Sequence, residues 1–118
     1  MDKVHVFLST GRFRSFDEMR EYIDPLYTQE GDAIPSAFIR EIGLSGYEPM
    51  CIEAIPSESG SAAPLSELLV GASWSDQWLA HVDGSRLADA AICVFAPNRV
   101  DHPSGSSLEY VGAFDYKS

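Results

Sequence analysis

The sequence predicts an α+β fold, with a four-stranded mixed sheet and helices mainly on one face. The chain has 118 residues, the length of one ordinary domain, so we expect a single domain over residues 1–118. Hydrophobic residues make up 45% of it and aromatic residues 11%, which is enough for a packed core. Apolar, β-branched runs alternate with segments of helical spacing, in the predicted order β-α-α-β-α-α-β-β.

The first half of the chain predicts two strands separated by two helices. Residues 3–9 are β-branched and aromatic, as in a buried strand. Ser15 and Glu18 then form an S-x-x-E capping box at the start of a helix. A second helix is expected to begin near Pro35 and to end at Gly43. The next strand is expected over residues 47–55.

The second half begins with a polar loop at residues 56–64, followed by two short predicted helices. The second of these is expected to start at a capping box made by Ser73 and Asp76. Residues 89–97 are a continuous apolar run, typical of a central strand covered on both faces. The last strand, residues 108–116, is expected to form an antiparallel hairpin with that run.

The net charge of −10 limits the classes of partner. An acidic surface repels nucleic acids and anionic membranes and attracts basic partners, although solubility alone would also account for it. The apolar run near the N-terminus is too short for a signal peptide or a membrane span, so the prediction is a cytoplasmic protein. Cys51 and Cys93 have no metal-type spacing, and no metal or cofactor is expected.

The segment GYEPMCIEAI, residues 46–55, contains residue types that occur in active sites. In a continuous strand, however, Glu48 and Glu53 point to opposite faces about 16 Å apart, whereas paired glycosidase carboxylates need about 5–10 Å. We therefore expect no catalytic residues. An alternative remains open: a small hydrolase-like enzyme with a site near the second strand, using Glu53, Cys51 and perhaps His5. Glu53 needs either a structural polar partner or a functional role.

Acidic residues are concentrated between positions 17 and 32, where six acids accompany one base, Arg20. Asp17, Glu21 and Asp24 follow helical spacing, and like charges at that spacing cost about 0.2–0.5 kcal/mol per pair. Two more acids follow in a predicted loop. The cluster is either a solvated face or a binding surface for a cationic partner. The five candidate partner-binding residues are Asp17, Glu21, Asp24, Glu30 and Asp32.

Several segments match a known pattern: VHVFLS, SAFIREIGLSGYEPMCIEA, GASWSDQW and ADAAICVFAP, together with Phe16 and Tyr22. In these features the chain resembles the immunity protein 22 family of bacterial polymorphic-toxin systems. Tyr47, Glu48 and Glu53 match the family pattern and are candidate structural or functional polar residues.

The resemblance implies an α+β fold, no enzymatic activity, and a cytoplasmic inhibitor that binds a cognate toxin, often a nuclease. The leading prediction is therefore an immunity protein that blocks a basic toxin through the acidic residues. A non-catalytic adaptor or regulatory module remains an alternative. The sequence leaves the oligomeric state open.

Overall fold

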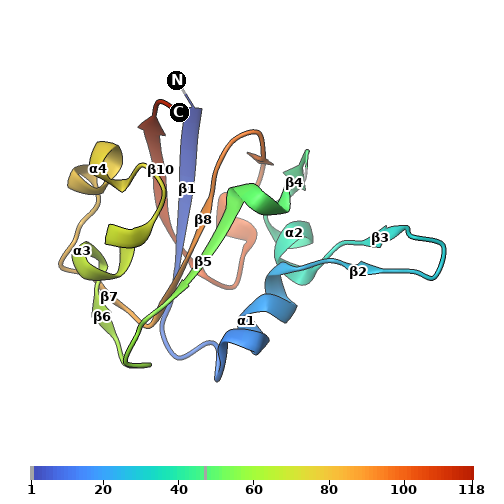
Figure 1. Ribbon diagram of the computed structural model, residues 1–118, viewed down its shortest axis with the longest axis horizontal. Coiled ribbons are helices and arrows are strands. Elements are labelled where there is room, and N and C mark those ends of the chain that lie inside the picture. Colours follow the sequence, from blue (N-terminus) through green and yellow to red (C-terminus); the bar gives the residue numbers. More distant parts are fainter. Residues whose placement is uncertain (1, 47) are drawn as a thin grey trace.

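The computed structural model describes residues 2–46 and 48–118, and its centre is a four-stranded sheet (Figure 1). The strands are β1 (Asp2–Ser9), β5 (Ile52–Pro56), β8 (Ala90–Val94) and β10 (Glu109–Tyr116), in the spatial order β10-β1-β8-β5. The α+β prediction is confirmed. Every neighbouring pair is antiparallel, so the prediction of a mixed sheet is wrong.

The strand order also corrects the predicted hairpin. β1 lies between β8 and β10, so the last two long strands do not pair with each other. β1 and β5 run in the same direction, since both are antiparallel to β8, but β8 separates them. Every residue of β8 is buried, which explains its central place: an apolar strand needs cover on both faces.

Helices cover both faces of this sheet, which corrects the prediction that they lie mainly on one face (Figure 1). One layer contains α1 (Phe16–Ile23) and α2 (Ala37–Glu41). The other contains α3 (Leu65–Leu68) and α4 (Ser75–Trp78), each extended by a 3-10 turn, η2 (Leu69–Gly71) and η3 (Leu79–His81).

Side-chain alternation along the strands supplies a core to each layer. On β1, Val4, Val6 and Leu8 pack with Leu65, Leu69 and Trp78 in the α3–α4 layer. Phe7 points the other way and meets Phe38 of α2, with ring centroids 5.2 Å apart. Because both faces of the sheet are apolar, one helical layer could not have buried them.

Three short two-stranded ribbons complete the fold. They pair β2 (Leu26–Tyr27) with β3 (Ala33–Ile34), β4 (Leu44–Ser45) with β9 (Arg99–Val100), and β6 (Ala63–Pro64) with β7 (Leu87–Ala88). The β2–β3 ribbon connects α1 to α2 and extends away from the rest of the molecule (Figure 1). The sequence analysis expected a loop in this region, which the turn between the two strands confirms, but it expected neither strand.

The predicted helix ends are largely confirmed. Ser15 caps α1, its Oγ accepting the Glu18 N–H at 3.1 Å. Gly43 follows α2 with φ +61°, a conformation that favours glycine. The predicted cap at Ser73 is wrong, because Trp74 occupies the N-cap position of α4, with φ 54°. No helix within the described ranges is both long and apolar enough to span a bilayer.

The predicted strand over residues 47–55 begins only at Ile52. Residues Pro49–Cys51 form a 3-10 turn, η1, and a further 3-10 turn, η4, covers Pro103–Gly105. Glu48 is the N-cap of η1, so it never belonged to the strand that carries Glu53. Tyr47 lies outside the described residues.

Candidate functional site

The acidic candidates lie on α1 and on the loop that closes the β2–β3 hairpin. Asp17 and Glu21 are exposed on α1, and Glu30 and Asp32 are exposed in the loop. Within residues 2–46 and 48–118 no basic side chain forms an ion pair with any of these four. The helix dipole accounts for Asp17 in the first turn but for none of the other three. We call these four residues the acidic surface.

Asp24, the fifth predicted residue, is paired within the chain. Arg20 binds it through two hydrogen bonds, Nε to Oδ2 at 3.0 Å and a terminal nitrogen to Oδ1 at 2.6 Å. The pair neutralises the carboxylate locally, so Asp24 differs from the four acids above. The i, i+4 spacing of Arg20 and Asp24 was a usable signal in the sequence.

Apolar side chains are exposed beside these acids. Leu26, Tyr27 and Ile34, three of the four residues in β2 and β3, have exposed fractions of 70%, 63% and 48%. A shallow hollow of about 430 Å³ lies where the hairpin leaves α1 and is lined by Arg20, Glu21, Asp24, Pro25 and Leu26. The region therefore combines exposed apolar area with unpaired negative charge.

The base of the hairpin is held by hydrogen bonds to the helices. Ser36, the N-cap of α2, donates from Oγ to the carbonyl of Ile23 at 2.7 Å and accepts the Ile39 N–H at 3.2 Å. The hairpin loop is closed by Thr28, whose N–H donates to the Asp32 carbonyl at 2.9 Å and whose Oγ1 accepts the Asp32 N–H at 3.1 Å. Both ends of the hairpin are therefore fixed.

A polar cluster that the sequence analysis missed ties α1 to α2. The hydroxyl of Tyr22 donates to Glu41 Oε1 at 2.5 Å and lies 2.9 Å from Ser106 Oγ. The N–H of Ser107 also donates to Glu41, at 3.1 Å. Burial, followed by the Glu41 hydrogen bond, raises the pKa of Tyr22, so the phenol stays a donor. Separations of 19 to 85 positions left no local signal for this cluster.

The three residues of the hydrolase-like alternative do not gather in one pocket. His5 lies on the face of β1 that carries Phe7, and its Nδ1 is 3.0 Å from the Tyr110 hydroxyl. Glu53 pairs with Cys93 in the sheet and faces the α3–α4 layer, as that residue does. Cys51 packs against the same layer. The histidine is therefore on the opposite side of the sheet from the carboxylate and the thiol.

Glu53 and Glu48 both have structural partners. Glu53 Oε1 accepts the Ser73 N–H at 3.0 Å, and its Oε2 accepts a hydrogen bond from Ser73 Oγ. Glu48 Oε1 accepts the Met50 N–H at 3.2 Å, and the buried Asn98 binds both the N–H and the carbonyl of Glu48. Of the three residues that match the family pattern, these two stabilise loops, and Tyr47 is outside the described part of the chain.

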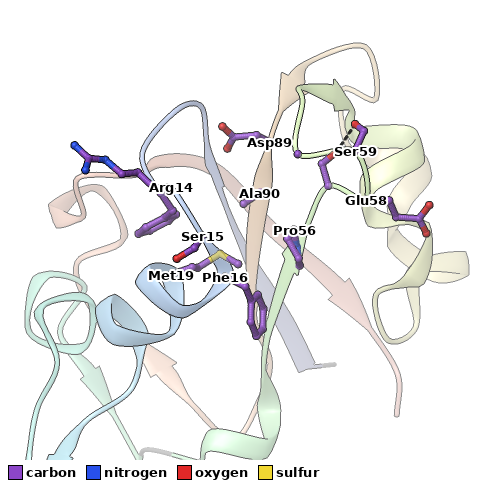
Figure 2. A pocket seen from close by; sticks show the side chains of 12 residues that line it. Arg14, Ser15, Phe16, Met19, Pro56, Glu58, Ser59, Asp89 and Ala90 are labelled. Carbon is purple, nitrogen blue, oxygen red and sulfur yellow. Dashed lines mark hydrogen bonds between the residues drawn. The ribbon is translucent and has the colours of Figure 1, made fainter.

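A pocket of about 380 Å³ lies between the start of α1 and the loop after β5 (Figure 2). Its polar groups already serve the fold. Ser15 caps α1, Asp89 Oδ2 accepts the Gly11 N–H at 2.6 Å, and the hydroxyls of Ser57 and Ser59 lie 3.3 Å apart. Figure 2 shows the charged ends of Arg14 and Glu58 directed to opposite sides of the pocket. Arg14 and Glu58 therefore do not face each other across the pocket.

The described residues also contain no group of three or more His, Cys, Asp or Glu side chains that could hold a metal ion. Burial, with the charge of Glu53 as a smaller cause, raises the pKa of the Cys93 thiol. The α1 and β2–β3 region carries exposed acids, a hollow and exposed apolar side chains, which are features of binding surfaces.

Comparison with known proteins gave one match. The family model described as immunity protein 22 matches residues 4–117. Neither a curated protein nor a solved structure matches the chain.

Proposed function

Because the chain belongs to the immunity protein 22 family, we propose that it neutralises a cognate toxin by binding it through the acidic surface of α1 and the β2–β3 loop. The family supplies the toxin-neutralising role. The location of the binding surface and the nuclease class of the toxin are our inferences. The protein would meet its target in the cytoplasm of the cell that makes the toxin.

The observation that supports this location is the set of four exposed carboxylates without ion-pair partners in the described chain, Asp17, Glu21, Glu30 and Asp32. A nuclease needs Lys and Arg side chains to hold phosphates. An acidic protein surface can occupy the same basic groups, and the two opposite fields accelerate association. Binding there would exclude the nucleic acid from the toxin.

The test is a charge reversal with a matched control. The variant is Glu21→Lys with Glu30→Lys, which leaves the Arg20–Asp24 pair intact. The control is Glu67→Lys with Asp76→Lys, two exposed acids of the α3–α4 layer that give the same change in net charge. The association rate with the purified toxic domain of the cognate toxin is measured by stopped-flow fluorescence at low and high salt.

We expect the Glu21/Glu30 variant to associate at least about tenfold more slowly at low salt and to lose most of the salt dependence. The control should retain both. An unmodified protein that binds equally fast at low and high salt would refute electrostatic steering. Equal losses in variant and control would refute the location. A basic partner without toxic activity would favour the adaptor alternative.

A further inference from the structure

The β2–β3 hairpin is a two-stranded ribbon that stands alone. It extends from α1 and α2 without lying on either helical layer (Figure 1). All four of its strand residues are exposed. A ribbon of two strands is marginal in water unless it packs against something else. Its fixed base and hydrogen-bonded loop hold it in place, so the exposed apolar side chains are available to a partner at low ordering cost.

Both faces of this ribbon are apolar. Leu26 and Ile34 are cross-strand partners and therefore share one face. Tyr27 is the next residue along β2, so it points to the other face, opposite Ala33. A partner surface lying flat against the ribbon would cover only one of these faces. A cleft would cover both.

The tip of the ribbon carries charge instead. Glu30 and Asp32 are exposed in the closing loop and have no ion pair within the described ranges. Glu21 lines the hollow at the base. Carboxylates at the tip complement a cleft with a basic floor, and apolar sides complement apolar or aromatic walls. Grooves that hold single-stranded nucleic acid combine these two features.

We propose that the β2–β3 hairpin inserts as a finger into a concave, basic-floored cleft of the toxin, with Leu26, Tyr27 and Ile34 packed against its walls. This inference rests on the proposed function and adds the mode of inhibition: the finger fills the groove where the toxin holds its substrate. The apolar side chains contribute most of the affinity, and the acids increase the association rate and orient the hairpin as it approaches the cleft.

The experiment compares the two faces of the ribbon separately. Leu26→Ser and Tyr27→Ser each remove one apolar side chain, from opposite faces. The matched control is Leu87→Ser, an apolar residue 57% exposed on β7, away from the hairpin (Figure 1). Affinity for the purified toxic domain of the cognate toxin is measured by calorimetry, and thermal unfolding is measured without toxin.

Insertion predicts that both hairpin variants raise Kd by about 30-fold, as loss of a central contact does, and that Leu87→Ser leaves it unchanged. Because the hairpin side chains are exposed, Tm should move by less than about 3 °C. A loss of affinity from one face only would indicate flat docking and overturn the finger model. A fall in Tm of about 10 °C would overturn it too, by assigning the side chains a structural role.

The outcomes separate this inference from the proposed function. If the unmodified protein neither binds nor inhibits the toxin, the proposed function fails and the inference fails with it. If the unmodified protein inhibits, and the Glu21/Glu30 variant binds slowly while both hairpin variants bind normally, only the finger model fails. The acidic surface would then act without the ribbon.

Discussion

Replacing Glu53 with alanine should destabilise the domain by about 2–3 kcal/mol, because two hydrogen bonds to its carboxylate would be lost. One comes from the Ser73 N–H at 3.0 Å and the other from the Ser73 hydroxyl. Hydrogen bonds to charged groups contribute about 1.5–3 kcal/mol each, so two give at least about 3 kcal/mol, and the partial exposure of Glu53 reduces this to about 2–3 kcal/mol. The pair joins β5 to the segment that begins α4.

The expected change in melting temperature follows from the size of the chain. An unfolding entropy of about 2.1 cal/mol/K per residue, over 118 residues, gives about 0.25 kcal/mol/K. A loss of 2–3 kcal/mol therefore lowers Tm by about 8–12 °C. Glu58→Ala is the matched control, since it removes an exposed carboxylate nearby and should change stability by less than about 0.5 kcal/mol.

The assay is thermal unfolding followed by circular dichroism, with Ser73→Ala completing a double-mutant cycle. The cycle should give a coupling energy of about 1 kcal/mol between Glu53 and the Ser73 hydroxyl. A Glu53→Ala protein that melts within about 2 °C of the unmodified one would show that these two hydrogen bonds contribute little to stability. So would a coupling energy of zero, which would mean that the hydroxyl contact contributes nothing to stability.

Three other predictions follow from named contacts. Gly105→Ala should cost at least about 2 kcal/mol in urea denaturation, since its Cβ would lie 2.2 Å from the Glu41 carbonyl oxygen; an unchanged midpoint would contradict this. Burial, then the charge of Lys3, lowers the pKa of His5 below 6.5. As the pH falls, His5 therefore takes up a proton at a higher pH in the unfolded chain than in the folded one. The free energy of unfolding should decrease as the pH drops below about 6.5, and by less in His5→Gln. The half-buried Cys51 should react with a thiol reagent in the native state, and the buried Cys93 only after denaturation; equal native rates would contradict this.

The sequence was most informative where a few neighbouring residues decide the outcome. The box of Ser15 and Glu18 acts within one helical turn, and Gly43 relieves a local steric conflict. The apolar run around β8 indicated a central strand because composition alone requires its burial. The acidic residues could be found for a simpler reason, since charge is a property of each residue, but their distribution between α1 and the tip of an extended hairpin was not visible in the sequence.

The candidate site contained features that sequence reasoning did not reach. β2 and β3 have two residues each, too few for a visible alternation, and their pairing depends on the turn between them. Thus only a loop was expected between the two helices, neither strand was predicted, and the exposure of Leu26, Tyr27 and Ile34 could not be foreseen. Whether a side chain is exposed depends on which distant segments pack against it, and the neighbouring residues in the sequence do not show this.

The kind of most main segments, the net charge and the family could be predicted from the sequence alone. Tertiary structure decided the strand order, the second helical layer, and the partner of Glu53, which is Ser73, 20 positions away. Helical backbone hydrogen bonds and capping hydrogen bonds join residues a few positions apart, so a short stretch of sequence is enough to predict them. Strand order instead depends on how distant segments jointly cover both faces of an apolar sheet, which only the assembled chain can settle.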